Sequence, residues 1–417
     1  MIERKDLKNP KKDGNSMIRI ALLGFGVVGS GTAEVLTENA SLISKRYGEE
    51  FEIGYILDLR EFPDHPLGGR VVHDIAPILA DPEVRVVAEM LGGSHPAYEF
   101  TKAALEAGKS VVTSNKEVVA TYGVELLELA RRKGVSYLFE ANVGGGIPII
   151  RPLRDDLSPN EILSVSGILN GTTNYILSRM KDGQVTFSEA LKEAQSLGYA
   201  EANPAADVEG TDAARKIGIL AALAFGVLIQ PTAIRTVGIA GITAGQTSLA
   251  ASLGCSVKLI AHTERVGTKV LALVEPHLVP ASNPICHVEG VFNGILVNAA
   301  HLGKTFFSGA GAGKLPTASA VVADLLNAAT GKARLPEWVP AAPEMIADPA
   351  DRVCRRAFRF KGCAKCAEKT KTYFGYTDFA LGEGTFAFIS RPMNEKEARD
   401  AIAACGKELC ETLPVLD

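Results

Sequence analysis

The sequence predicts an α/β protein in three parts: a doubly wound parallel-sheet domain, an α+β domain and a small C-terminal α+β appendage. Short apolar runs alternate with helix-compatible segments up to Glu140, glycine-rich turns follow, and four prolines from Pro336 to Pro349 then mark a linker. One hydrophobic core serves at most roughly 250 to 300 residues, fewer than the 417 here. We expect residues 1–17 to form a flexible leader, 18–140 with a return of 309–335 the first domain, 141–308 the second, 336–351 the linker and 352–417 the appendage.

Composition and charge narrow the classes of partner. The formal net charge is −4, and no basic stripe is present that would neutralise phosphates, so we expect no nucleic-acid partner. No apolar run is long enough for a membrane span, and the first residues lack the apolar segment of a secretory signal. The seven cysteines, an odd number in a long chain, predict free thiols. We therefore expect a cytoplasmic protein that binds a small molecule.

The first domain opens with a strand, a glycine turn and a helix. Ile18–Leu23 is an apolar run, and apolar residues recur at helical spacing from Val35 to Ile43. Strand-like runs then alternate with helix-compatible segments, which is the pattern of a Rossmann-type sheet with crossover helices. The predicted strands are Phe51–Leu57, Val84–Met90, Ser110–Thr113 and Ser136–Phe139, and the predicted helices are Pro96–Ala107 and Gly123–Lys133.

The turn after the first strand has the glycine spacing of a dinucleotide site. Gly24 would permit a tight turn, Gly26 a close approach of the backbone to a pyrophosphate, and Gly29 the packing of the helix on the strand. Its place between a strand and a helix favours a bound dinucleotide over a glycine-rich turn without a ligand. The predicted cofactor contacts in this turn are Gly24, Phe25, Gly26, Val27, Val28 and Gly29.

The end of the second strand bears on the choice of cofactor. Asp58 could accept hydrogen bonds from a ribose 2′-hydroxyl, whereas Arg60 could pair with a 2′-phosphate, so NAD and NADP both stay open. Asp58 lies 29 residues past Gly29, later than the usual spacing of roughly 20. We therefore expect a long helix between them.

The rest of the chain mixes strands and helices. In the second domain and the return we predict strands at Ile162–Leu169, Val270–Val279 and Gly290–Asn298, helices at Phe187–Leu197, Asp212–Phe225 and Thr317–Ala329, and a loop at Gly309–Gly313. In the appendage we predict a strand after Arg352, a Cys/Lys-rich loop, a strand at Thr385–Ser390 and a helix at Glu395–Glu408. The apolar pieces Leu249–Ala261 and Val288–Val297 could form a subunit interface, so we expect a homodimer or a dimer of dimers.

Two segments indicate the chemistry. One is Thr113-Ser114-Asn115-Lys116 at the end of a strand, and the other is GYAEANPAADVEGTDAARK, from Gly198 to Lys216. Asp212 and Lys216 are spaced i, i+4 at the start of a predicted helix, so both side chains can reach one point. Alone, such a pair is most often an exposed salt bridge. Lys116 and Lys216 come from different domains and could converge on a substrate oxygen at the crevice between them.

The second segment resembles the signature of the homoserine dehydrogenase family, and the resemblance extends from about Ile18 to about Asn327. The matching positions are Ala194, Gly198, Asn203-Pro204, Asp207-Val208, Gly210, Asp212 and Lys216. The resemblance implies reversible reduction of L-aspartate 4-semialdehyde to L-homoserine by NADH or NADPH, in threonine, methionine and isoleucine biosynthesis. Two alternatives are a nucleotide-binding regulator that has lost the chemistry and a dehydrogenase of another amino-acid aldehyde.

The resemblance also implies roles for individual residues. Lys216 would donate and accept the proton, Lys116 would be its partner near the nicotinamide and the substrate oxygen, and Asp212 would orient substrate or water. Glu201 would receive the substrate's α-ammonium group, and Asp207 would also lie at the substrate.

Glycine-rich turns would complete the site. In Asn170-Gly171-Thr172-Thr173 the backbone N–H groups of Gly171 and Thr172 would bind the α-carboxylate, and plain helix capping is the alternative. Glu140 to Ile147 resembles the family's monovalent-cation loop, in which one carboxylate and several carbonyls would bind sodium; an interdomain hinge is the alternative. The sodium ligands would be Glu140, Val143, Gly145 and Ile147, and the further cofactor contacts Gly92, Gly93, Ser94, Lys116, Gly311 and Gly313.

The tail contains a candidate regulatory module and a CxxC motif. Longer family members end in a regulatory ACT domain that binds an amino acid, but the usual Asp-x-Pro-Gly turn is missing here and the tail looks short for a full module. Inhibition by threonine is therefore a hypothesis from position and length alone. Cys363-Ala364-Lys365-Cys366 is a CxxC motif that leaves a zinc site, a regulatory disulfide and ordinary thiols open.

Overall fold

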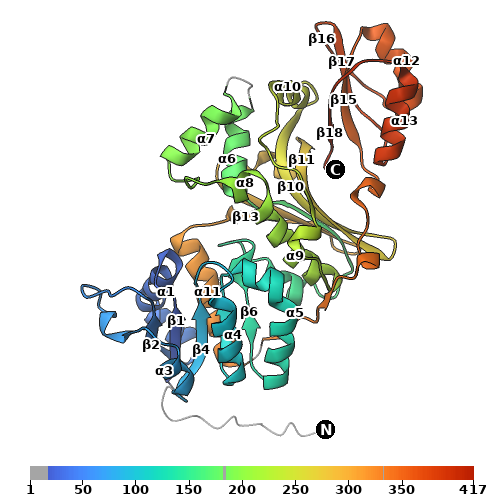
Figure 1. Cartoon of the computed structure of the whole chain (residues 1–417). Helices are drawn as coiled ribbons and strands as arrows, with labels where there is room; N and C mark the ends of the chain where they lie inside the picture. Colours follow the sequence, from blue (N-terminus) through green and yellow to red (C-terminus); the bar gives the residue numbers. More distant parts are fainter. Residues whose placement is uncertain (1–16, 182–184, 332) are drawn as a thin grey trace, which may run out of the picture.

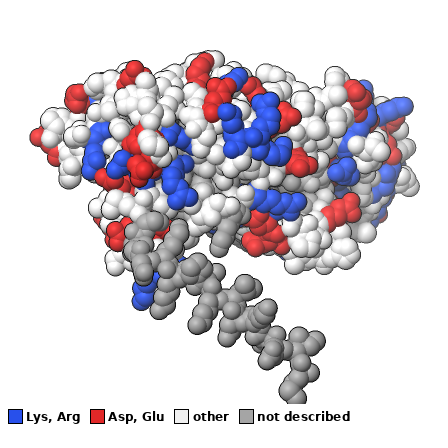
Figure 2. Space-filling view, turned by 90° about the horizontal axis from the view of Figure 1, so that it is seen from below, with Lys and Arg blue, Asp and Glu red and all other residues white. Residues whose placement is uncertain are grey.

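The computed structural model describes residues 17–181, 185–331 and 333–417, and these form three parts (Figure 1). The predicted leader lies outside the described residues except for Met17, which already belongs to the first strand. Within the described ranges no helix is both long and apolar enough to cross a membrane. On the face drawn in Figure 2, basic and acidic side chains are interspersed.

The first part is a six-stranded parallel sheet with the order β3-β2-β1-β4-β5-β6, which confirms the predicted fold class. The strand order reverses between β1 and β4, so their carboxyl ends border the crevice where such sheets bind ligands. The strands are β1 Met17–Leu23, β2 Glu50–Leu57, β3 Val71–Val72, β4 Val84–Glu89, β5 Ser110–Thr113 and β6 Tyr137–Leu138.

Helices cover both faces of this sheet (Figure 1). Five come from the first part of the chain: α1 Val27–Glu38, α2 Ala40–Tyr47, α3 Ala76–Ala80, α4 Ala97–Glu106 and α5 Lys116–Lys133. A sixth, α11 Lys314–Thr330, returns from much later in the sequence and packs against α1, β4 and β5. The close packing of α11 on α1 depends on Gly31, because a Cβ there would lie 2.9 Å from the Lys314 side chain.

Two helix predictions for this domain were wrong. The single long helix expected between Gly29 and Asp58 is two helices, because the Asn39 side chain bonds back to Val35 O at 3.1 Å and the backbone leaves the helical region. The helix α5 begins at Lys116 rather than Gly123. It begins there because Asn115 caps it by accepting a hydrogen bond from the Val118 N–H.

The second part is a six-stranded sheet with the order β13-β12-β7-β10-β11-β9, antiparallel except for the pairing of β9 with β11. Helices α6 and α9 pack on it. Its strands are β7 Ile162–Ile168, β9 Arg235–Thr236, β10 Cys255–Val266, β11 Lys269–Pro280, β12 Phe292–Ala299 and β13 Gly303–Ala310. The helices are α6 Gly171–Met180, α7 Phe187–Ser196, α8 Ala205–Val208, α9 Thr211–Phe225 and α10 Ala244–Ser252, and β8 Val227–Leu228 pairs separately with β14 Val339–Pro340.

The predicted loop Gly309–Gly313 is shorter than expected. β13 pairs with β12 as far as Ala310, so only residues 311–313 lie between this strand and α11. The apolar pieces expected at a subunit interface are largely buried within the chain itself. Leu249 lies in helix α10, and Val257 to Ala261 are covered on both faces of β10, whereas Phe292 on β12 is 53% exposed. These residues of β10 therefore contribute mainly to the core of the domain.

The third part is a complete β-α-β-β-α-β unit with the sheet order β16-β17-β15-β18. Its elements are β15 Arg356–Lys361, α12 Ala364–Phe374, β16 Ala380–Gly382, β17 Thr385–Ile389, α13 Glu395–Cys405 and β18 Leu409–Pro414. The predicted Cys/Lys-rich loop is thus a helix, since Ala367 and Phe374 pack into an aromatic core with Phe358 and Phe360. The tail is also long enough for a full module, contrary to our expectation.

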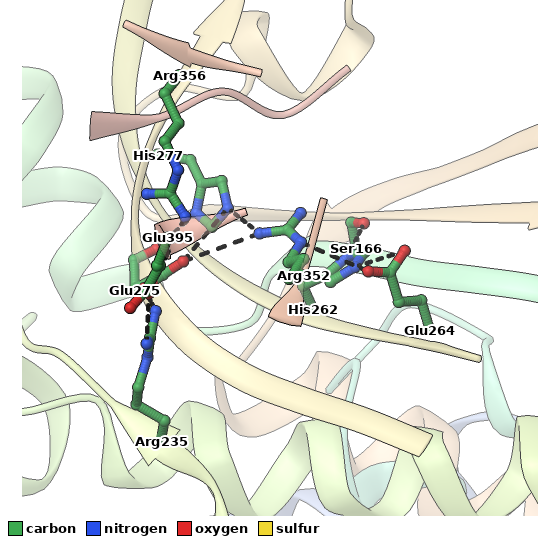
Figure 3. Close-up of polar contacts among 9 residues, drawn as sticks. All are labelled: Ser166, Arg235, His262, Glu264, Glu275, His277, Arg352, Arg356 and Glu395. Carbon is green, nitrogen blue, oxygen red and sulfur yellow. Dashed lines mark hydrogen bonds and ion pairs between the residues drawn. The ribbon is translucent and has the colours of Figure 1, made fainter. Parts of the chain in front are cut away.

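A buried polar network joins this module to the second sheet (Figure 3). The guanidinium of Arg352 donates to His277 Nε2 at 2.7 Å, and Arg235 bridges Glu275 of β11 at 2.7 Å and Glu395 of α13 at 2.6 Å. On the neighbouring strand the His262 ring contacts Ser166 at 2.8 Å. The network fixes the orientation of the tail on the sheet.

His277 must stay neutral in this network. Its Nε2 accepts the Arg352 N–H, and its Nδ1 lies 3.0 Å from the Glu275 carbonyl, to which it donates, so no position is left for a second proton. Burial, reinforced by the charge of Arg352, holds the pKa of His277 well below its ordinary value. The neutral His277 ring therefore makes its full contribution to the free energy of unfolding above pH 6.5, the ordinary pKa of histidine in an unfolded chain. This contribution is lost as the pH falls, because the unfolded chain then binds a proton that the folded chain does not.

We expect the stability advantage of the unaltered protein over His277→Asn to shrink by about 1.4 kcal/mol between pH 7.5 and pH 5.5. Urea denaturation at the two pH values measures it, and the comparison cancels the other titrating groups. His301→Asn, at an exposed position, is the matched control and should follow the unaltered protein. An advantage that does not change with pH would contradict a neutral buried His277.

Candidate active site

Three predicted residues meet where the first two parts of the chain face each other. Lys116 begins α5, directly after β5, and Asp212 and Lys216 lie on the first turns of α9. The Asp212 carboxylate is 3.2 Å from Lys116 Nζ through Oδ1 and 2.8 Å from Lys216 Nζ through Oδ2. Lys216 also donates to Leu169 O at 2.6 Å. One carboxylate thus holds two ammonium groups from different domains at one point.

The charge state of this group follows from its surroundings. Burial by itself raises the pKa of Asp212, but the ammonium groups of Lys216 and Lys116 outweigh it and hold that pKa well below its usual range. The carboxylate is therefore ionised at neutral pH. The side chains of Asp212 and Lys216 are about one tenth exposed and that of Lys116 is 36% exposed, so an incoming molecule reaches the group from the Lys116 side.

Asn170 is a site residue that the sequence analysis missed. Its side-chain N–H₂ donates to Asp207 Oδ1 at 2.7 Å and to Asp212 Oδ2 at 3.1 Å, while its Oδ1 accepts the Thr173 N–H at 2.9 Å. It therefore caps α6 and ties two acidic groups together. Burial raises the pKa of Asp207. The available signal was the position of Asn170 before a helix, which we interpreted only as a cap.

The start of α6 lies in this same region. Gly171 needs to be glycine, because a Cβ would lie 2.6 Å from Val291 O, and the Thr172 hydroxyl donates to Tyr199 O at 2.6 Å. Capping by Asn170 is thus present, and it does not occupy the first backbone N–H groups of the helix, which are oriented to attract an anion. By contrast, the side chain of Glu201 is exposed and has no contact with the lysines or Asp212 among the described residues.

The glycine turn has the geometry that its spacing predicts. Gly24 has φ +90°, and a Cβ on Gly29 would lie 2.1 Å from Gly24 O, so both positions require glycine for the fold. A Cβ on Gly26 would meet nothing within 4 Å, so this glycine leaves open space in front of the start of α1. Val27 is exposed beside it and Val28 half-buried. The turn therefore presents bare backbone at a helix N-terminus, as a pyrophosphate site requires.

Asp58 and Arg60 pair with each other. Asp58 accepts hydrogen bonds from the Phe25 N–H at 2.7 Å and from the Arg60 guanidinium at 2.9 Å through each oxygen. The hydrogen bonds from Arg60 hold the pKa of Asp58 well below its usual range, although partial burial acts against them. Asp58 thus supports the glycine turn directly, and Arg60 lies exposed at its rim.

The loop after β4 is held by residues that the site prediction omitted. The Asn115 side chain donates to Gly93 O at 2.7 Å, and Ser94 donates to Glu117 at 2.7 Å. Glu117 in turn lies 3.5 Å from Arg215 of α9, across the crevice. Below them Glu89 accepts the Leu91 N–H, and burial raises the pKa of this carboxyl to about 7. Gly92 and Gly93 are exposed at the carboxyl end of the sheet.

The segment after β13 returns to the crevice by close backbone contact. A Cβ on Gly145 would lie 2.4 Å from Gly311 O, and a Cβ on Gly311 would lie 2.0 Å from the Asn293 side chain. Gly313, with φ +120°, then begins α11. The loops that contain the predicted cation ligands and the late cofactor contacts thus touch each other.

The Glu140 carboxylate also holds the backbone that follows its loop. It accepts the N–H groups of Ile149 at 2.7 Å, Ile150 at 2.9 Å and Arg151 at 2.7 Å, because it sits at the start of the helical segment that follows the loop. Three acceptor positions of the carboxylate are thus used within the chain, and one stays open on Oε2. No cluster of three or more His, Cys, Asp or Glu side chains suited to a metal occurs in the part of the chain that the structure describes. A cation here would need backbone and amide oxygens besides the Glu140 carboxylate.

The fold and the site define a dinucleotide-dependent oxidoreductase, with the reacting groups between a Rossmann-type sheet and a second α+β domain. Two family models match the chain: "Homoserine dehydrogenase, NAD binding domain" at residues 24–140 and "Homoserine dehydrogenase" at residues 148–326. A homoserine dehydrogenase of Neisseria gonorrhoeae is 44% identical over 344 residues, covering 82% of this chain and 76% of that protein. The chain belongs to the homoserine dehydrogenase family, whose members are NAD(P)-dependent oxidoreductases acting on a CH–OH group.

Solved structures agree with this assignment. A homoserine dehydrogenase from Thiobacillus denitrificans has a TM-score of 0.84 and 35% identity, covering 97% of this chain and 99% of that chain. A hyperthermophilic archaeal homoserine dehydrogenase mutant, solved in complex with NADPH, has a TM-score of 0.65 and 28% identity, covering 76% of this chain and 99% of that chain.

Proposed function

We propose that the protein is a homoserine dehydrogenase that reversibly reduces the aldehyde of L-aspartate 4-semialdehyde to L-homoserine, in threonine, methionine and isoleucine biosynthesis. The observation that supports this most is the Lys116–Asp212–Lys216 group at the crevice beside the glycine turn. NAD or NADP, when bound, supplies or accepts the hydride. The chain itself supplies the proton and the charge that the substrate oxygen needs.

Lys216 is the proton donor and acceptor in this proposal. An ammonium group has three N–H bonds, and Lys216 directs two of them to Leu169 O and Asp212, which leaves one for a substrate oxygen in the crevice. Lys116, the more exposed of the two, stabilises negative charge on the same oxygen. Asp212 keeps both ammonium groups together and orients the substrate or a water molecule.

The substrate's other groups are assigned by charge. The first N–H groups of α6, at Gly171 and Thr172, receive the α-carboxylate. Asp207 lies nearby, where it accepts a hydrogen bond from the side chain of Asn170. The exposed carboxylate of Glu201 receives the α-ammonium group, which requires its loop to close over the bound substrate. Gly92, Gly93, Ser94, Gly311 and Gly313 complete the cofactor contacts in the proposal.

A monovalent cation, sodium, is proposed at the loop Glu140 to Ile147, held by the carboxylate of Glu140 and the backbone carbonyls of Val143, Gly145 and Ile147. Hard oxygen ligands of this kind suit such an ion. Supporting observations are the buried side-chain oxygens of Asn142 and Asn293, which have no hydrogen-bond partner among the described residues. We expect sodium chloride to raise the melting temperature more than choline chloride at equal ionic strength. Equal effects of the two salts would contradict the site.

The remaining proposals concern the assembly, the location and the regulation of the protein. The seven cysteines are all free, which supports a location in the reducing cytoplasm. A homodimer or dimer of dimers is also proposed and is tested by light scattering.

Inhibition by threonine through the tail is tested by the rate of L-homoserine oxidation and the melting temperature, with and without threonine. No effect on either quantity would remove this proposal.

The experiment that tests the function is the initial rate of L-homoserine oxidation, followed by NADH or NADPH absorbance with NAD and with NADP at alkaline pH. Turnover with either cofactor is the expected result, and the ratio of the two rates gives the preference that the Asp58–Arg60 pair leaves open. Folded protein without activity with both cofactors would overturn the proposal in favour of a binding protein or another aldehyde.

A further inference from the structure

Two cysteines of the tail lie in contact at the start of a helix. Cys363 is the N-cap residue of α12 and Cys366 lies in its first turn, with their Sγ atoms 3.6 Å apart. Cys363 is exposed, whereas Cys366 is half-buried against the aromatic core of the tail. One thiol is thus open to an attacking molecule, and its neighbour is shielded but within reach.

The surroundings favour the thiolate of the exposed cysteine. The backbone N–H of Cys366, its thiol and the backbone N–H of Lys365 all lower the pKa of Cys363. The other thiols of the tail lack this arrangement. Burial raises the pKa of Cys354, Cys405 donates to Ile402 O at 3.2 Å, and Cys410 lies exposed on β18.

The position directly before the pair requires glycine. Gly362 has φ +148°, which L side chains rarely adopt, and a Cβ there would lie 2.8 Å from the Cys366 Cβ. A disulfide needs the two sulfurs at about 2.05 Å, so they must approach by roughly 1.5 Å, which side-chain rotation at Cys363 can supply. The motif also occupies the connection between the first strand and the first helix of the β-α-β-β-α-β unit.

We propose that Cys363 and Cys366 form a redox-active dithiol that closes to a disulfide by exchange with an external disulfide such as oxidised glutathione. The Cys363 thiolate attacks one sulfur of the external disulfide, and the partner's other sulfur leaves as a thiolate that takes up a proton. Cys366, after losing its proton, attacks Cys363 Sγ and releases the second glutathione thiol. Two protein thiols are oxidised and one external disulfide is reduced to two thiols, so two electrons and two protons leave the pair.

A zinc site at this position is not supported. Zinc in structural sites takes four ligands, and among the described residues no third or fourth His, Cys, Asp or Glu side chain joins the pair. The distance between the two thiols and the exposure of only one of them match an exchange reaction instead.

The full-length protein tests the proposal in glutathione buffers of increasing oxidised fraction, with differential alkylation and peptide mass spectrometry. We expect a Cys363–Cys366 disulfide to form reversibly, and Cys363 to be alkylated roughly tenfold faster than Cys410 in the reduced protein. Cys366→Ser should trap one glutathione on Cys363, and the matched variant Cys410→Ser should leave the disulfide intact.

The outcomes are separate from the proposed catalytic function, because Cys363 and Cys366 lie outside the crevice. The rate of L-homoserine oxidation should be the same in Cys366→Ser as in the unaltered protein, which checks folding. Equal alkylation of Cys363 and Cys410, or no disulfide between Cys363 and Cys366 in fully oxidised glutathione, would overturn the proposal. Binding of Cu(I) by the reduced pair without disulfide formation would also overturn it, in favour of a metal site.

Discussion

Replacing Lys216 with alanine is expected to lower the turnover of L-homoserine by a factor on the order of 100 or more, with cofactor binding nearly unchanged. The Lys216 ammonium is held by Leu169 O and Asp212 and has one N–H left for the substrate oxygen. Its loss removes the proton source without touching the glycine turn on the other domain. Steady-state rates and a fluorescence titration with the reduced cofactor measure the two effects.

The controls separate chemistry from folding. Lys216→Ala leaves the buried Asp212 carboxylate with one ammonium partner, so Lys216→Met, which keeps most of the side-chain volume, and Lys216→Ala/Asp212→Asn, which also removes the charge, should show the same loss of turnover. Lys258 is a matched buried lysine outside the site, bonded to Val288 O at 2.6 Å. Lys258→Met should lower stability more than turnover. Loss of cofactor binding in Lys216→Ala would mean that the residue belongs to the nucleotide site.

Gly26→Ala is expected to weaken cofactor binding by a factor on the order of 100, equivalent to about 2.7 kcal/mol, with an unchanged melting temperature. A Cβ at this position meets no protein atom within 4 Å, so the folded chain tolerates it. The methyl group would instead stand where the turn exposes its backbone to a pyrophosphate. Fluorescence titration with NADH and NADPH, together with thermal unfolding, measures both quantities.

Two other glycines serve as controls for this prediction. Gly69→Ala, also in open space but away from the turn, should change neither binding nor stability. Gly29→Ala should lower the melting temperature strongly, because its Cβ would lie 2.1 Å from Gly24 O. Unchanged cofactor binding in folded Gly26→Ala would show that the cofactor does not approach the backbone here.

The parts of the site that were predictable are those with local spacing. The strand, the three glycines and the helix are adjacent in the chain, and φ +90° at Gly24 and the close contact at Gly29 follow from that short segment. The i, i+4 spacing of Asp212 and Lys216 likewise sets their 2.8 Å contact as soon as α9 forms. Such features depend on a few residues of backbone geometry.

The wrong helix predictions concern segments whose limits depend on a side-chain contact or on packing. Asn39 divides the first long helix, although asparagine alone only lowers helix propensity. The tail helix α12 was interpreted as a loop because cysteines and lysines dominate its sequence. Only its packing shows that Ala367 and Phe374 face the core.

The fold class, the glycine turn, the family resemblance and the Asp212–Lys216 pair follow from the sequence. Packing between distant segments brings Lys116 to Asp212 from the other domain and ties Asp207 to Asp212 through Asn170. It also lets Asp58 support Phe25 while Asp58 pairs with Arg60. The reason is the distance along the chain over which a sequence pattern is informative. Spacing along a helix or turn fixes neighbours within a few residues, whereas contacts between domains depend on how whole surfaces pack and on which of several donors reaches each buried acceptor.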